Sequence, residues 1–152
     1  MRASAAHTMD EILTAYVRDV ALHRSRAFAD RTLKVERMLR GFLEDFGPAF
    51  PLSEEEQLFA DAERQLGSPD PYLRALTPPS FVHALACFLD VPASQPLLRR
   101  RQIDVVSDLG DIFGRAPHLR GDPMCLALGH LSAALHEAER DHRAHPVDRR
   151  GG

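Results

Sequence analysis

Apolar residues return every three or four positions through most of this chain, and prolines and glycines separate the runs. The clearest run ends at Gly47-Pro48 and comprises Leu33, Val35, Met38, Leu39, Phe42, Leu43 and Phe46. This spacing places the apolar side chains on one face of an α-helix. Leu and Ala number 40 together, against 15 for Val, Ile and Thr, and that ratio favours helices over strands. The pattern predicts an all-α fold.

Capping residues, prolines and glycines set the bounds of the predicted helices. These helices cover residues 8–28, 30–46, 53–66, 77–91, 95–114 and 122–145, and one further turn is expected around Tyr72 and Leu73. Thr8 and Asp30 are the expected caps of the first two. The predicted inward faces include Ile112 in the fifth helix and, in the third, Leu58, Phe59, Ala62 and Leu66. We expect a compact bundle of about five to six helices, one domain over residues 8–145, with disordered ends at 1–7 and 146–152.

Length and composition indicate an ordinary globular domain. The chain has 152 residues and a net charge of −3, and no apolar run reaches the length of about 20 residues that a membrane helix needs. No secretory leader opens it, so we expect a cytoplasmic protein with no membrane partner. Its basic residues are 18 Arg and one Lys, a choice that the codon bias of high-GC bacteria explains. Cys87 and Cys125 lie in apolar helical stretches and are predicted to be core residues.

Two short rows of basic residues are the candidate contacts to DNA. Lys34, Arg37 and Arg40 recur every three residues in the second helix, and Arg99, Arg100 and Arg101 adjoin one another in the fifth. Such rows can follow a phosphate backbone, although exposed helix faces are routinely charged. Arg100 also lies four residues before Asp104, within reach of an ion pair. The segment 48–90 holds seven acidic and two basic residues and should repel phosphate.

Motifs for catalysis or metal binding are missing from the sequence. There is no phosphate-binding glycine loop, no CxxC pair and no nucleophile elbow. His130, His136 and His142 are six residues apart, which splays them around a helix, while His142 and His145 are three apart and offer weak chelation at most. We therefore expect no enzymatic activity, no cofactor and no metal.

Part of the chain resembles the SAM-like core-binding domain of tyrosine recombinases, the phage integrases. The resemblance is carried by Arg31-Thr32-Leu33, the stretch from Leu39 to Gly47, Leu76-Thr77, Arg99-Arg100-Arg101 and the stretch from Leu119 to Pro123. It implies a four-helix bundle that clamps DNA opposite a catalytic domain. The sequence departs from that family in an acidic insertion at 52–70, in an acidic row in the fifth helix, and in ending before a catalytic tyrosine domain. The family's chemistry is therefore not carried over.

Three functions remain open. The first is a non-enzymatic interaction module that binds a protein partner or a second copy of itself, since short amphipathic helices can leave an apolar groove exposed. The second is a DNA-associated module that uses the six basic residues named above. The third is a metal-binding helical bundle that uses the histidines near the carboxyl terminus. We predict the first.

Overall fold

The computed structural model describes residues 7–116 and 121–144, and within these ranges the chain is helical without a strand. The elements are α1 (Met9–His23), α2 (Arg26–Phe46), the 3₁₀ turn η1 (Gly47–Ala49), α3 (Glu54–Gln65), α4 (Pro71–Ala75), α5 (Pro78–Phe88), α6 (Pro96–Arg115) and α7 (Asp122–Ala144). The all-α prediction is confirmed, and α4 is the single turn expected around Tyr72. The predicted disordered ends lie outside the described residues, apart from His7.

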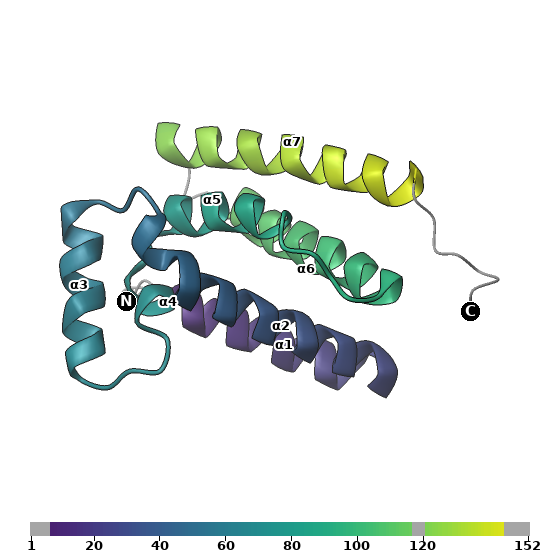
Figure 1. Cartoon of the computed structure of the whole chain (residues 1–152), viewed down its shortest axis with the longest axis horizontal. Coiled ribbons are helices and arrows are strands. Elements are labelled where there is room, and N and C mark those ends of the chain that lie inside the picture. Colours follow the sequence, from purple (N-terminus) through teal and green to yellow (C-terminus); the bar gives the residue numbers. More distant parts are fainter. Residues whose placement is uncertain (1–6, 117–120, 145–152) are drawn as a thin grey trace.

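The long helices stack in three layers (Figure 1). α7 covers α5 and α6, α6 packs on α2, and α1 lies beside α2 in the opposite layer. α3 stands at one end of the bundle, across the direction of the long helices, and packs chiefly on α4. α3 is therefore covered by the bundle along one side.

The boundary between α1 and α2 differs from the prediction. α1 begins as expected, with a reciprocal capping box between Thr8 and Glu11. It ends at His23, however, and Ser25 caps α2 by accepting a hydrogen bond from the backbone N–H of Phe28 at 3.2 Å. Asp30 lies inside α2 and is not the cap. Serine is among the best N-cap residues. Ser25 marks the start of a new helix, which the spacing of the apolar residues does not reveal.

The core lies around α5, which is enclosed by its neighbours. Phe81, Phe88 and Phe113 are its largest fully buried side chains, together with leucines from α1, α2, α5 and α6. The ring of Phe113 meets that of Phe81 edge-on, with 5.8 Å between centroids. Most of the predicted inward residues are confirmed, whereas Leu33, Phe46 and Ile112 are exposed. Each of these three lies at the margin of its apolar stripe or at a helix end, where packing stops.

α4 belongs to the core although it follows a proline-rich stretch. The side chains of Tyr72 and Leu73 are almost completely buried. The ring of Tyr72 lies against Gly47, where the chain leaves α2, so closely that a Cβ on Gly47 would fall 2.6 to 2.7 Å from the ring carbons. Only glycine fits there without moving the ring. The stop after α2 and the seating of α4 thus depend on each other.

The prediction that both cysteines are core residues is wrong. Cys87 and Cys125 are free thiols, and both are exposed. Burial in α5 falls on residues 81, 82, 84, 85 and 88, and in α7 on residues 124, 127, 131 and 138, so each cysteine lies beside its buried stripe. A small residue on the outer side of an apolar helix leaves the sequence pattern unchanged, which is why the pattern misplaced them.

Candidate interaction surface

The apolar side of α3 faces away from the bundle, opposite to the prediction. Leu58, Phe59 and Leu66 are 62%, 50% and 82% exposed, and Ala62 is exposed with them. The buried residues of the helix are instead Glu56 and Ala60. We call Leu58, Phe59, Ala62 and Leu66 the α3 apolar face. An expected core stripe is therefore a surface of the folded protein.

Glu56 holds α3 in this orientation. Its side chain is only 5% exposed, and its carboxylate accepts four hydrogen bonds. Oε1 accepts from the backbone N–H of Ser53 at 3.0 Å and from the hydroxyl of Ser80 at 3.2 Å. Oε2 accepts from the backbone N–H of Thr77 at 2.8 Å and from its hydroxyl at 3.0 Å. One carboxylate thereby joins the first turn of α3 to the first turn of α5.

The charge of Glu56 fits this site. Burial acts to raise the pKa of its carboxyl, but the hydrogen bonds from the backbones of Thr77 and Ser53 and from two hydroxyls favour the ionised form and outweigh it. The net effect is a pKa below the ordinary value for glutamate. A buried carboxylate is tolerated only when its oxygens are satisfied, and here they are.

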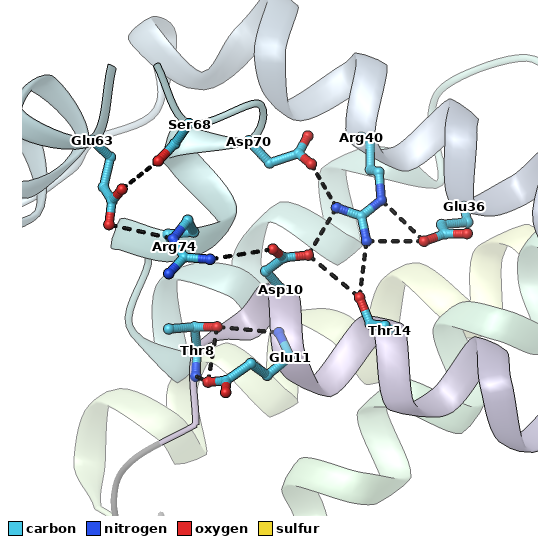
Figure 2. A network of polar contacts seen from close by, with 10 residues as sticks. All are labelled: Thr8, Asp10, Glu11, Thr14, Glu36, Arg40, Glu63, Ser68, Asp70 and Arg74. Atoms are coloured by element: carbon cyan, nitrogen blue, oxygen red, sulfur yellow. Dashed lines mark hydrogen bonds and ion pairs between the residues drawn. The ribbon is translucent and has the colours of Figure 1, made fainter. Parts of the chain in front are cut away.

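A second polar network lies between α3 and the long helices and is centred on Arg40 of α2 (Figure 2). Nη1 of Arg40 donates to Asp70 at 2.7 Å and to Asp10 at 2.9 Å, and its Nε donates to Glu36 at 3.0 Å. Burial acts to lower the pKa of Arg40, but its three acidic partners outweigh that and raise it. The guanidinium therefore connects α1, α2 and the segment before α4.

Arg74 of α4 continues this network to α3. It lies 3.7 Å from Asp10 and donates from Nε to Glu63 of α3 at 3.3 Å (Figure 2). Glu63 also accepts a hydrogen bond from the hydroxyl of Ser68, which lowers the pKa of its carboxyl. Glu56 and Glu63 both lie on the side of α3 opposite Leu58, because they are two residues before it and five after it. The inward side of α3 is thus polar and specifically bonded.

Four of the six predicted DNA contacts are engaged inside the molecule. Arg40 is held as described, and Arg99 donates to the carbonyl of Leu89 at 2.7 Å. Arg100 pairs with Asp104 at 2.8 Å, as the spacing predicts, and with Glu139 of α7 at 2.6 Å. Lys34 and Arg37 are exposed on α2.

Arg101 is the most buried of the six, at 4% exposed. Its guanidinium lies 3.9 Å from the ring centroid of Phe28 and donates to the hydroxyl of Tyr16 at 3.2 Å. Burial, and then a hydrogen bond to Asp108, raise the pKa of Tyr16. Stacking on an aromatic ring stabilises a cation out of water. Arg101 thus joins α6 to α1 and α2.

The histidines of α7 do not converge with one another. His130 instead meets His83 of α5, with their Nδ1 atoms 3.4 Å apart, a contact that no sequence spacing indicated. His136 is exposed, and His145 lies outside the described residues. Over residues 7–116 and 121–144, no group of three or more His, Cys, Asp or Glu side chains is arranged to hold a metal ion.

Comparisons with known proteins return no match to a family model, to a curated protein or to a solved structure. The resemblance to recombinase core-binding domains stays a prediction. Among the helices of the described ranges, none combines the length and the apolar character needed to cross a membrane. The α3 apolar face is the feature of the surface that departs most from the sequence expectation, and it is the candidate site.

Proposed function

We propose that this protein is a helical interaction module that binds a protein partner through the α3 apolar face. The single observation that carries the proposal is the orientation of α3, which exposes Leu58, Phe59 and Leu66 while burying Glu56. Clustered exposure of large apolar side chains on a folded surface is typical of interaction sites. Covering the exposed part of each side chain favours association, with about 1.5–3 kcal/mol per side chain as the upper limit that full burial would give.

The orientation is fixed rather than incidental. Turning α3 by half a rotation would bury its leucines, but it would also remove Glu56 from the donors on Thr77 and Ser80. It would separate Glu63 from Arg74 as well. The backbone N–H of Thr77 and the hydroxyl of Ser80 would then lose their acceptor, and a buried donor without a partner is unfavourable. The polar side of α3 therefore keeps its apolar side available to a partner.

The DNA-associated hypothesis has less support. Of its six candidate residues, Lys34 and Arg37 are exposed, while the other four arginines make contacts that hold helices together. Binding phosphate with those four would require breaking these contacts. We therefore favour the protein partner.

Site-specific photocrosslinking tests the proposal. A benzoylphenylalanine in place of Phe59 is compared with one in place of Leu22, which is 73% exposed on α1 and serves as the matched control. In the cells that make the protein, we expect position 59 to give one discrete adduct that mass spectrometry identifies, and position 22 to give none.

The dependence on the α3 apolar face provides the second half of the test. The adduct should disappear when Leu58→Ser and Leu66→Ser are introduced together, with the helical circular dichroism unchanged. An adduct that forms equally from both positions, or that survives the two substitutions, would count against the proposal. So would the absence of any adduct at position 59.

A further inference from the structure

We infer that the segment which binds the α3 apolar face is a cationic amphipathic helix of a protein partner. This inference rests on the proposed function and adds the chemistry of the occupant. It is carried by the exposed leucines and by the acidic side chains beside them.

Acidic side chains border the α3 apolar face. Glu54, Glu55 and Asp61 are all exposed. At 100° per residue, Glu54 and Asp61 lie on one flank of the line through Leu58, and Glu55 lies within the stripe near its amino-terminal end. Asp61 also accepts a hydrogen bond from the amide of Gln57 at 3.1 Å. The rim of the apolar face is therefore negative.

The one basic residue of α3 is directed elsewhere. Arg64 lies over the ring of Tyr72, at 5.3 Å from its centroid, and 3.7 Å from Glu44 of α2. Its side chain is half exposed, but its ion pair is with Glu44 rather than with the acidic residues of the rim. An apolar stripe with a negative rim is complementary to apolar anchors flanked by Lys and Arg.

The dimensions fit a short helix. Leu58, Ala62 and Leu66 follow one another at intervals of four, and they span about 12 Å, or a little over two turns. Phe59 widens the stripe on one side. An amphipathic helix with anchors at i, i+3, i+4 and i+7 presents a stripe of similar length, about 10 Å.

The negative charge beside the α3 apolar face disfavours the other possible occupants of this surface. In a second copy of the chain, Glu54, Glu55 and Asp61 would meet the same three carboxylates, and like charges across an interface disfavour it. Nucleic acids and anionic lipid surfaces would be repelled for the same reason. The charge thus selects the cationic helix among the candidates.

A pair of synthetic probes tests the inference. Both are fluorescein-labelled peptides of about 18 residues, long enough to be helical, with Leu at i, i+3, i+4 and i+7. Lys fills the outer positions of one and Glu those of the other. By fluorescence anisotropy at low salt, we expect the Lys peptide to bind at least about tenfold more tightly than the Glu peptide, and the gap to shrink near 0.5 M salt because of screening.

Substitutions of the acidic residues and of the leucines separate the contributions of charge and of apolar contact to peptide binding. Glu54→Gln, Glu55→Gln and Asp61→Asn together should bring the two peptides to within about threefold of each other by removing the local charge. The matched control is the set Asp30→Asn, Asp111→Asn and Glu137→Gln, three exposed acids on other helices, which should leave the preference unchanged. Leu58→Ser with Leu66→Ser should abolish binding of the Lys peptide.

The outcomes are distinguishable. Equal binding of both peptides that still requires Leu58 and Leu66 overturns the cationic partner but leaves the proposed function standing. Binding of the Lys peptide that survives Leu58→Ser with Leu66→Ser is attraction by charge alone and overturns the inference. So does a failure of the Lys peptide to bind, while the photocrosslinking above judges the proposed function independently. A dimer in light scattering that Leu58→Ser with Leu66→Ser dissociates would identify a second copy as the occupant instead.

Discussion

Replacing Glu56 with Gln should destabilise the protein by about 2–4 kcal/mol, although the change alters one atom. Glu56 accepts from two backbone N–H groups and two hydroxyls, distributed two to each oxygen. A glutamine amide has only one oxygen, so its NH₂ group must face the other pair of donors. The hydroxyl of that pair can rotate to accept, but the backbone N–H cannot. One unsatisfied buried N–H costs about 1–3 kcal/mol, and the loss of charge assistance to the remaining bonds adds to it.

Urea unfolding followed by circular dichroism measures this loss. Glu55→Gln is the matched control, because Glu55 is the exposed neighbour on the same helix turn and its replacement should shift the free energy of unfolding by less than about 0.5 kcal/mol. If Glu56→Gln cost no more than Glu55→Gln, the assignment of Glu56 as the anchor of α3 would be refuted.

The difference in the free energy of unfolding between the wild type and Glu56→Gln should depend on pH. Because the pKa of folded Glu56 lies below its ordinary value of 4.5, its ionised form stabilises the native state. This contribution is fully present above the ordinary pKa and is lost as the pH falls through the lower folded pKa. Near neutral pH the wild type should therefore exceed Glu56→Gln by the full margin, and in acid the margin should shrink. A margin that grows on acidification would contradict the predicted sign.

Further predictions concern the scaffold and the two cysteines. Arg40→Lys should lower the free energy of unfolding by about 1–3 kcal/mol, because an ammonium cannot reproduce the geometry that joins three carboxylates; a loss below about 0.5 kcal/mol in urea unfolding would contradict this. Gly47→Ala should destabilise by about 1–3 kcal/mol through its clash with the tyrosine ring of α4, whereas Gly41→Ala, in open space within α2, should stabilise by about 0.5–1 kcal/mol. Cys87 and Cys125 should both react with a thiol reagent at mildly alkaline pH without denaturant, and a native protein with only one reactive thiol would show that a cysteine is covered.

The positions of the helices followed largely from local sequence. Thr8 with Glu11 begins α1, Gly47-Pro48 ends α2, and Thr77-Pro78 begins α5, as the pattern predicted. The starts of α1 and α5 are set by groups within one turn of helix, so neighbouring residues suffice to define them. The stop at Gly47 is equally visible in the sequence, although the ring of Tyr72 also packs against it. Where the prediction was wrong, at the boundary between α1 and α2, the missing information was still local, in Ser25.

The candidate site could not be predicted from local sequence signals. The apolar stripe of α3 has the same spacing as the buried stripe of α2, and nothing within the helix distinguishes a core face from an exposed one. The deciding donors belong to Thr77 and Ser80, more than twenty residues from Glu56. Similarly, Arg40 and Arg101 resemble surface residues until Asp70 and Phe28 are placed beside them.

The sequence by itself thus determined that this chain is a helical bundle and where most of its helices begin and end, because the spacing of apolar residues and the capping groups act over a few residues. Only the tertiary structure decided which side of α3 faces outward and which basic residues remain at the surface. Those outcomes depend on whether a polar group finds its partners when distant segments meet, as Glu56 finds its donors on Thr77 and Ser80, because a buried donor without an acceptor is unfavourable.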